Sequence, residues 1–481
     1  MPQPSIKKNY IYNTFYQLLT IVIPFITSPY ISRVFQADGV GIYSYTNAIC
    51  TYFTLIAALG VTSYGQREIA LHRDDPQKAS KLFWEIEIMC VSTTVISLLL
   101  WTVLIFVSED YSQYYVILTM TVFATAFDIS WFWGGYEKYK LIVVRNTVIK
   151  LIGVVVLFVF VNDKSDLALY IALIAITGLL GNISMWTYLP KYIVKIDWKS
   201  LNLKRHYKQT LVYFVPTIAT SIYTVLDKAM IGWITNDDCQ NGYYEQATKM
   251  INICKSLVLS INTVVSSRMS FLFGKQKHNE IKSLLKTTMN FVLILSLPIV
   301  FGLVAIAKDF VPLFFGPGYD EVVILLCIMS SLIVIIALSN CLGALYFTPS
   351  GQRARSSKGI VAGAILNMIA NSILIPFFAA RGAAVGTVIA ECAITIIYLY
   401  MAKDYFKVSV IAKVGWKPLV SSVIMFAVVY FAGDFISHPF VTILIQLILG
   451  AIIYVLCLFV LKDEFICKNS KKILSKFLKI R

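Results

Sequence analysis

Long apolar runs alternate with short polar segments along the whole chain, and this pattern decides the expected fold. A helix needs roughly 20 apolar residues to cross the hydrocarbon core of a bilayer. Runs of that length predict fourteen membrane-spanning helices, at residues 9–32, 39–62, 84–108, 112–134, 141–162, 167–189, 209–233, 245–267, 287–307, 322–347, 359–379, 382–402, 415–433 and 439–461. The expected fold is therefore an all-α polytopic membrane protein with about 14 transmembrane helices.

Two stretches, 18–51 and 211–255, share one layout of a helix, a short loop and a second helix. The second helix opens with Gly41-Ile-Tyr43 in the first copy and with Gly242-Tyr-Tyr244 in the second. Because each copy begins a series of about six hydrophobic segments, the sequence predicts a duplicated transporter. The corresponding division is an N-lobe at 1–190 with spans 1–6, a cytoplasmic linker at 191–208, a C-lobe at 209–403 with spans 7–12, spans 13 and 14 at 404–461, and a basic amphipathic cytoplasmic tail at 462–481.

The composition supports a membrane protein and argues against an enzyme. Of the 481 residues, 58% are hydrophobic and 14% are charged, whereas a soluble domain carries about 25% charged residues. No predicted loop is long enough for a catalytic domain, and no phosphate-binding G-x-x-x-x-G-K-[ST] motif is present. The nine cysteines are scattered without a C-x-x-C pair, so neither a disulfide framework nor a metal site is expected.

Basic residues gather on one side of the predicted membrane. If the N-terminus lies in the cytoplasm, segments on that side hold 34 of the 42 Lys and Arg residues, and the outside loops hold only Arg33, Lys164, Lys308 and Arg381. Cytoplasmic loops are rich in Lys and Arg, so both termini are expected in the cytoplasm. The net charge of +16 then lies where anionic headgroups attract it, which favours membrane lipids over nucleic acid as partners.

An ionised group within a span costs roughly 2.5–3.5 kcal/mol. Seven charged residues within spans are candidates for a role there: Asp128, Lys150, Asp227, Lys228, Lys249, Lys255 and Glu391. They are therefore expected to face the protein interior. In one interpretation they form sealed ion pairs, joining Asp227 to Lys228 or Lys249, Asp128 to Lys150, and Glu391 to Lys255. In the other they line a wet cavity, which the excess of four lysines over three carboxylates favours.

Uncharged polar residues and prolines within spans suggest further roles. Four asparagines are expected to hydrogen-bond between helices: Asn182, Asn340, Asn367 and Asn371. Three prolines each remove a helical hydrogen bond and are candidate hinges, because they interrupt the first helix of each copy: Pro24, Pro29 and Pro216. The four histidines, at positions 72, 206, 278 and 438, are all expected in loops.

Three stretches of the chain carry short motifs. The first holds Ser32-Arg33-Val34, Gly41-Ile-Tyr43 and Tyr64-Gly-Gln-Arg67-Glu68, the second Leu226-Asp227-Lys228 and Gly242-Tyr-Tyr244, and the third Leu374-Ile375-Pro376, Gly382-Ala383-Ala384 and Glu391. In these motifs the chain resembles the oligosaccharide-lipid flippases of bacterial polysaccharide export (Wzx type), of the multidrug/oligosaccharidyl-lipid/polysaccharide exporter superfamily. It departs from that family at Gln36-Ala37-Asp38-Gly39, where Gly-Pro-Glu-Gly is usual.

The resemblance implies two six-helix lobes around a central cavity that opens to one side at a time, with spans 13 and 14 at the periphery. It also implies a cationic cavity for undecaprenyl-diphosphate-linked oligosaccharide, with Lys150, Lys228, Lys249, Lys255 and Arg33 as candidate binding residues. Asp128, Asp227 and Glu391 are candidates for coupling transport to a proton or sodium gradient, and no other cofactor is expected.

Expected partners beyond the lipid-linked glycan are a polysaccharide polymerase and the chain-length machinery. Two alternatives from the same superfamily stay open, namely a drug or organic-cation antiporter and a lipid II flippase. A cavity for organic cations should be acidic, so the excess of embedded lysines argues against the antiporter.

Overall fold

The computed structural model describes residues 6–403, 405–406, 408–433 and 438–467, with side chains from residue 18 onward except at 20, 215–216, 219–220, 222–224 and 263–264. Within these ranges the chain forms helices and their connections, and no strand. This confirms the all-α polytopic fold expected from the apolar runs. The predicted hinge residue Pro216 and most of the predicted basic tail, from residue 468 on, lie outside what is described.

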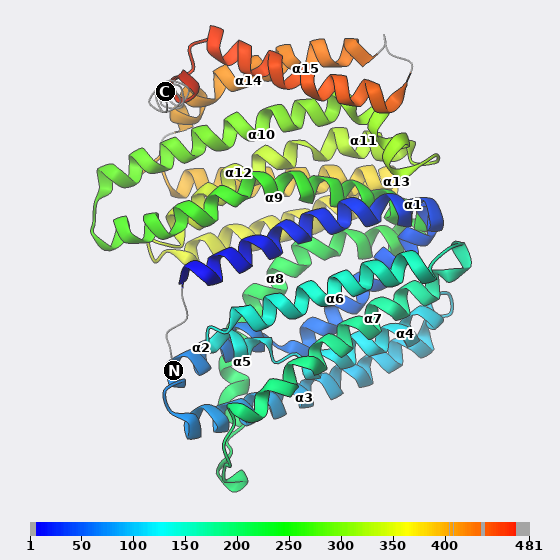
Figure 1. Cartoon of the computed structure of the whole chain (residues 1–481), viewed down its shortest axis with the longest axis vertical. Helices are drawn as coiled ribbons and strands as arrows, with labels where there is room; N and C mark the ends of the chain where they lie inside the picture. Colours follow the sequence, from blue (N-terminus) through cyan, green and yellow to red (C-terminus); the bar gives the residue numbers. More distant parts are fainter. Residues whose placement is uncertain (1–5, 404, 407, 434–437, 468–481) are drawn as a thin grey trace, which may run out of the picture. The chain divides into compact units, whose positions relative to one another are not determined.

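The helices follow one another with short connections (Figure 1). Their bounds are α1 Ile6–Ala58, α2 Val61–His72, α3 Pro76–Val107, α4 Ser112–Ala124, η1 Thr125–Phe127, α5 Ser130–Gly135, α6 Tyr139–Phe160, η2 Lys164–Asp166, α7 Leu167–Ser184, η3 Met185–Lys191, η4 Trp198–Ser200, α8 Lys204–Thr235, α9 Asp238–Gly274, α10 His278–Phe315, α11 Asp320–Met329, α12 Ser331–Leu342, the π-helical η5 Gly343–Phe347, α13 Arg353–Met401, α14 Val408–Gly433 and α15 Pro439–Val460.

Eleven helical segments of the described chain are long and apolar enough to cross a membrane. Two of them contain two arms each, because α1 has a non-helical residue at Gln36 and α13 has one at Ala379. The two arms of α13 pack antiparallel, since Tyr398 on the second donates a hydrogen bond to the Ser356 carbonyl at the start of the first. Counting these arms separately and adding α8 gives the fourteen spans predicted from the sequence.

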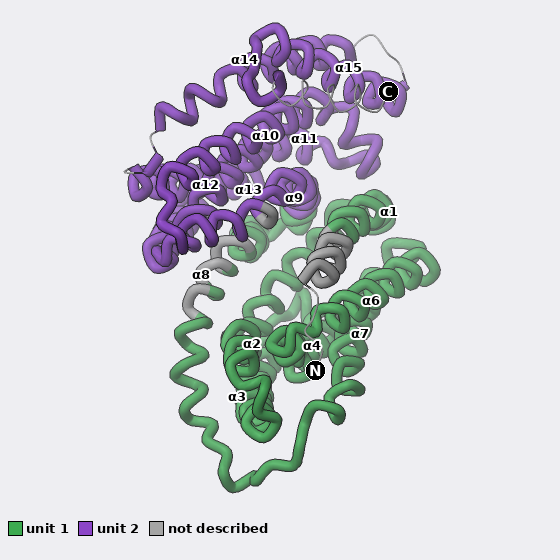
Figure 2. Tube along the Cα trace, turned by 60° about the vertical axis from the view of Figure 1, so that its left-hand side comes forward, with its two compact units in different colours: residues 1–242 green, residues 243–481 purple. Residues whose placement is uncertain are grey.

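The chain divides into two compact units, residues 1–242 and 243–481 (Figure 2). In unit 1, one apolar cluster joins α1, α3, α4, α6 and α7 around Phe35 and Trp101, and another joins α2, α3, α5 and η3 around Phe83 and Trp131. In unit 2, α14 and α15 pack on α10 through Ile306, Met425 and Leu458, among others. The lobe boundaries drawn from the sequence repeat, with their linker at 191–208, stay a prediction.

Both copies of the predicted hairpin are helix, turn and helix. The first turns at Gln36 and the second at Asn236, and these residues have left-handed φ angles of 57° and 50°. Neither Pro24 nor Pro29 breaks α1, because the backbone stays helical through both and departs only at Gln36. Whether these prolines act as hinges stays a prediction.

Two expectations about the spans are wrong in detail. The run 112–134 is not one helix, because α4 ends at Ala124 and a short break separates it from α5. The histidines are not all in loops, since His206 lies in the first turn of α8 and is fully buried, while His72 ends α2 and His278 begins α10. The polar composition of 191–208 indicates solvent exposure, but one face of the first turn of α8 packs against α3.

Candidate functional site

The predicted cationic residues of unit 1 occupy different environments. Lys150, on α6, lines a cavity of about 140 Å³. The walls of this cavity come from Ile23, Thr27 and Ile31 of α1 and from α7 residues that include Tyr170 and Thr177. Arg33 is exposed near the end of the first arm of α1. Of these two candidates, Lys150 is therefore the one that lines a hollow between helices.

Asp227 and Lys228 lie side by side on α8, but they are buried to different extents. Asp227 is 3% exposed and Lys228 is half-buried. The carboxylate of Asp227 lies within electrostatic range of the Tyr52 hydroxyl on the second arm of α1. This α8 carboxylate therefore faces α1, inside unit 1.

Within unit 1, the two copies of the hairpin come into backbone contact. A Cβ atom at Gly41 would lie 1.7 Å from the carbonyl oxygen of Asp238, and one at Gly242 would lie 1.9 Å from that of Ala37. Real Cβ atoms do not approach other atoms so closely, so only glycine fits at either position. The Asp238 carboxylate also accepts a hydrogen bond of 2.9 Å from the hydroxyl of Tyr111. The Gly-x-Tyr motifs found in the sequence are thus the points where α1 and the first turn of α9 touch.

In unit 2, the two lysines of α9 differ in their partners. The Lys249 ammonium lies 3.4 Å from the carboxylate of Glu245, one turn earlier on the same helix. Lys255 is half-buried and forms no hydrogen bond or ion pair within the described part of the chain. Lys249 therefore has a partner that the sequence interpretation did not consider, whereas the expected pairing of Lys255 with Glu391 does not form.

Glu391 lies on the second arm of α13 and is 4% exposed. Its side chain forms no hydrogen bond or ion pair with any described residue. An isolated ionised carboxylate is costly in an apolar interior. A buried carboxyl group without a fixed partner is suited to exchanging a proton or holding a small cation.

The asparagines of α13 form a close-packed polar contact. The Asn371 amide donates to the Asn367 side-chain oxygen at 3.3 Å, and both residues are fully buried. A Cβ atom at Gly386 would lie 2.2 Å from the Asn371 oxygen, so a glycine is needed where the second arm passes Asn371. One residue on, the Thr387 and Tyr244 hydroxyls lie 3.2 Å apart and link α13 to α9. Asn340 is half-buried on α12.

Asp128 lies at the break between α4 and α5 and bonds to the backbone there. Its carboxylate accepts a hydrogen bond of 3.0 Å from the Ser130 amide, as an aspartate commonly does in a turn. The Trp186 indole donates to the neighbouring carbonyl of Phe127 at 2.9 Å. Asp128 forms no ion pair with Lys150 or any other described residue, so the expected pair does not form.

The helix ends beside segments 67–81, 138–145 and 191–208 form the basic end of unit 1. The sequence interpretation missed a buried ionic network there. Glu85 on α3 is fully buried and accepts hydrogen bonds from the Arg205 guanidinium and the Asn202 amide. His206 Nε2 lies 2.9 Å from the same carboxylate, and its Nδ1 lies 2.6 Å from the Tyr64 hydroxyl. These contacts fix α8 to α2 and α3.

Glu87 was missed as well. It is 3% exposed on α3, and neither carboxylate oxygen has a hydrogen-bond partner among the described residues. The sequence did carry a signal, because Glu85 and Glu87 fall inside the predicted span 84–108 and Glu245 begins the predicted span 245–267. These three carboxylates change the balance of embedded charge on which the cavity interpretation partly depends.

Two family models match the chain. One is described as "Polysaccharide biosynthesis protein" and matches residues 6–273, and the other, "Lipid II flippase MurJ", matches residues 143–452. A protein of Escherichia coli (strain K12) named "Putative O-antigen transporter" is 24% identical over 407 residues, covering 83% of this chain and 97% of that protein. A protein of Shigella dysenteriae with the same name is 25% identical over 387 residues, with 79% and 96% covered.

Solved structures show the same fold. "Lipid II flippase MurJ, inward closed conformation" superposes with a TM-score of 0.73 at 17% identity, covering 95% of this chain and 99% of that one. An inward-facing multidrug resistance MATE family transporter of the MOP superfamily gives a TM-score of 0.63 at 12% identity, with 78% and 94% covered. At these identities the likeness concerns the fold alone.

Proposed function

We propose that this chain, which belongs to the polysaccharide biosynthesis protein family, is a flippase for lipid-linked glycan. It would move undecaprenyl-diphosphate-linked oligosaccharide repeat units from the inner to the outer leaflet of a bacterial cytoplasmic membrane. The products would supply capsule, exopolysaccharide or O-antigen-type biosynthesis. The proposed mechanism is alternating access, with binding on the inside and release on the outside.

The observation that carries this proposal is the placement of two lysines, Lys150 and Lys255, on helices that are long and apolar enough to cross a membrane. Lys255 has no partner within the described part of the chain, and Lys150 lines a cavity. A lipid diphosphate must leave the aqueous headgroup region, so an enclosed path has to replace that hydration with cations. Ammonium groups bind phosphate as point charges. An anionic substrate thus accounts for the lysines on these helices, because inserting each ammonium group into the membrane would otherwise cost roughly 2.5–3.5 kcal/mol.

Alternating access requires the outer end of the molecule to open and close. In the proposed cycle, the contacts of Gly41 with Asp238 and of Gly242 with Ala37 separate when substrate leaves. The substitution Gly41→Ala places a methyl group 1.7 Å from a carbonyl oxygen, so these contacts cannot form without displacement. Gly153→Ala is the matched control, since nothing lies within 4 Å of a Cβ atom there.

This step can be tested by thiol labelling of a single cysteine at position 239 in an otherwise cysteine-free chain. Cys239 is partly exposed and follows Asp238. Gly41→Ala should raise its labelling by a membrane-impermeant maleimide in intact cells, and Gly153→Ala should not. Equal labelling of the parent chain and both variants would contradict the assignment of this contact to the outer gate.

Coupling to a gradient is the next part of the proposal. The sequence interpretation offers Asp128, Asp227 and Glu391, and the structure favours Glu391, because Asp128 already serves the α4–α5 break and Glu391 has no described partner. A proton or sodium ion on Glu391 would be released in one conformation and bound in the other. A membrane potential acting on the charged lipid is the alternative driving force.

The family match to MurJ gives one specific reason for a second candidate, a lipid II flippase. The drug or organic-cation antiporter has no comparable support from the site, because the cavity-lining candidate Lys150 and the unpartnered Lys255 are both cationic. For either flippase the protein lies in the cell membrane with both termini in the cytoplasm. A polysaccharide polymerase and the chain-length machinery would receive the flipped unit.

The deciding experiment removes the gene and identifies the lipid-linked glycan that accumulates on the inner leaflet. An undecaprenyl-diphosphate-linked polysaccharide unit supports the proposal, and accumulation of lipid II supports the second candidate. Normal lipid-linked pools together with sensitivity to organic cations would instead point to an antiporter. Reporter tags at positions 36, 164 and 381 should read outside, and tags at 75, 200 and 278 should read inside.

A further inference from the structure

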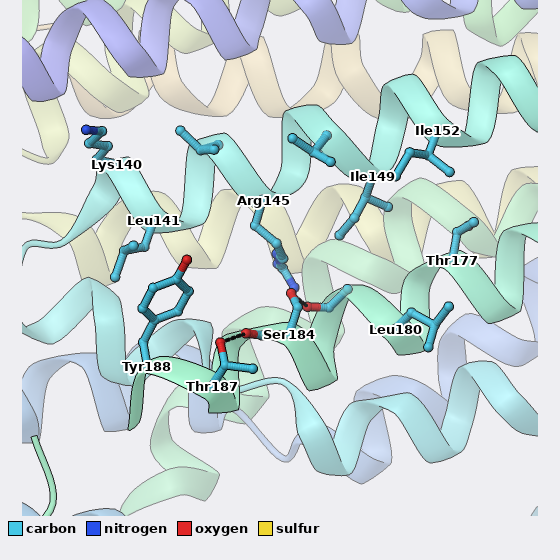
Figure 3. Close-up of a pocket in the computed structure, with 13 residues that line it drawn as sticks. Lys140, Leu141, Arg145, Ile149, Ile152, Thr177, Leu180, Ser184, Thr187 and Tyr188 are labelled. Atoms are coloured by element: carbon cyan, nitrogen blue, oxygen red, sulfur yellow. Dashed lines mark hydrogen bonds between the residues drawn. The ribbon is translucent and has the colours of Figure 1, made fainter. Parts of the chain in front are cut away.

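A groove of about 600 Å³ runs along unit 1 between α6 and α7, near its basic end (Figure 3). We propose that this groove binds one anionic glycerophospholipid, with its phosphate at Lys140 and Arg145 and an acyl chain along the aliphatic wall. This site goes beyond the proposed transport of a lipid-linked glycan. It would hold a resident lipid of the surrounding membrane.

The two ends of the groove differ in chemistry. Lys140, Arg145 and the hydroxyl-bearing side chains of Ser184, Thr187 and Tyr188 line one end, and no acidic residue lines any part of it. In Figure 3, the Arg145 side chain points from α6 toward α7, and the Tyr188 hydroxyl points toward α6. A lipid phosphate complements this end by its charge and by its many acceptor oxygens.

Arg145 is held in position by a chain of hydrogen bonds. Its guanidinium donates to the Asn182 side-chain oxygen at 2.8 Å, and the Asn182 amide donates to the carbonyl of Ala124 at 2.8 Å. Glu137, the acidic residue just before α6, is engaged by Arg73 at 3.0 Å. The guanidinium is therefore oriented by an uncharged side chain at the polar end of the groove.

The aliphatic wall follows from helical spacing. Val144, Val148 and Ile152 of α6 recur at four-residue intervals and are 46–49% exposed, and Leu180 of α7 is 59% exposed. The twelve residue-to-residue steps from Lys140 to Ile152 rise about 18 Å. This is close to the ~15 Å depth of one leaflet, half of a ~30 Å hydrocarbon core. The groove therefore matches an acyl chain of one leaflet with its phosphate at the interface.

The polarity of the groove favours a phospholipid over the transported lipid. Lys150 lines a separate small cavity that shares only Thr177 with the groove. A phosphate bound at Lys140 and Arg145 therefore has no continuous polar path through the groove to Lys150. A translocated headgroup needs a continuous polar path across the membrane, whereas this groove has a polar end and an apolar remainder. It is built to retain an amphiphile in one leaflet.

Binding can be measured on the full-length purified protein by native mass spectrometry and by titration of short-chain phosphatidylglycerol or phosphatidylcholine in mixed micelles. Phosphatidylglycerol should bind the parent chain more tightly than phosphatidylcholine. At about 1 kcal/mol per surface cation, Lys140→Gln should weaken phosphatidylglycerol binding about fivefold, and Lys140→Gln with Arg145→Gln about thirtyfold. Val148→Trp should block the groove for both lipids.

Matched controls separate the groove from general effects. Lys403→Gln changes an exposed lysine of unit 2, and Val155→Trp adds the same bulk at an exposed position of α6 that does not line the groove. Neither should alter binding. If Arg145→Gln unfolds the protein, Lys140→Gln and Val148→Trp still test the site.

Equal affinity for the two phospholipids overturns the proposal. So does an affinity for phosphatidylglycerol that neither Lys140→Gln nor Val148→Trp changes. So does displacement of phosphatidylglycerol by equimolar undecaprenyl phosphate, because the groove would then bind the polyprenyl lipid class to which the transported substrate belongs. These readouts need no transport, so their failure is distinct from failure of the proposed flippase function.

Discussion

Glu85 and Glu87 are two residues apart on α3 and both are buried in unit 1, but their surroundings are opposite. Glu85 faces the start of α8, where Arg205, His206 and the Asn202 amide converge on its carboxylate. Glu87 lies within electrostatic range of Asp128, and neither of its oxygens has a hydrogen-bond partner among the described residues. One helix thus carries a fully bonded buried acid and an unbonded one within a single turn.

The contrast separates charges that hold the fold from charges that need another explanation. Breaking a buried, bonded pair leaves an uncompensated group and is strongly destabilising. An unbonded buried acid contributes no such stability. The same contrast recurs on α9, where Lys249 is paired with Glu245 and Lys255 has no described partner. We therefore expect the bonded members to control folding and the unbonded members to control transport.

The largest expected effect is the difference between Glu85→Gln and Glu87→Gln. Removing the charge from Glu85 weakens three hydrogen bonds, one of them to the buried ring of His206, and should lower the free energy of unfolding by about 3 kcal/mol. The same change at Glu87 removes no hydrogen bond and should stay within about 1 kcal/mol. Thermal unfolding of the purified variants in one detergent measures both. Equal losses at the two positions would contradict the distinction.

The lysines of α9 give the corresponding test for transport. Lys255→Ala should melt like the parent chain but flip lipid-linked glycan at least about tenfold more slowly, because one charge-assisted phosphate contact is lost. Lys255→Arg should restore part of the rate. Lys249→Ala is the matched variant and should lower stability by up to about 1 kcal/mol, because its pair with Glu245 is only partly buried.

Flipping assays in proteoliposomes, with unfolding measured in parallel, separate these outcomes. If Lys255→Ala unfolds the protein, or flips at the parental rate, the lysine is structural or idle. The argument for an anionic substrate then loses its main support.

Glu391→Gln should have a smaller effect on the maximal rate and a specific effect on its driving force. The neutral amide cannot release a proton or bind sodium as a carboxylate does, so transport should lose its response to an imposed proton or sodium gradient. Asp128→Asn is the control, because that carboxylate serves the α4–α5 break. A gradient response that survives Glu391→Gln unchanged would exclude Glu391 as the coupling group.

Much of the fold could be predicted because local patterns encode it. Apolar runs of bilayer length give the helices, and the repeated motif around Gly41 and Gly242 marks the positions where the two hairpin copies touch. Pairing of charges could not be predicted in the same way. Glu85 and Arg205 are 120 positions apart, and only the packing of α8 on α3 brings them together. The Lys249–Glu245 pair is local, and counting Glu245 as embedded would have revealed it.

His206 gives the smallest predicted effect, and it concerns pH. This residue precedes the predicted span 209–233 and is fully buried beside Glu85 and Arg205. Burial lowers the pKa of His206 below its ordinary value, and the nearby charge of Arg205 acts in the same direction, although the hydrogen bond to Glu85 opposes both. The folded protein therefore binds a proton on this ring less readily than the unfolded chain does.

The sign follows from that difference. Where the unfolded chain binds more protons, stability rises with pH, so the contribution of His206 is fully present above an unfolded pKa of about 6.5 and is lost as pH falls below it. The slope is at most about 1.4 kcal/mol per pH unit for one proton.

Thermal unfolding between pH 8 and pH 5 should show this loss of stability, and His206→Gln, which keeps a donor for Glu85, should flatten it. His438→Gln alters an exposed histidine and should leave the slope unchanged. A parent chain that gains stability on acidification would instead mean that the hydrogen bond to Glu85 outweighs burial and holds the ring in its charged form.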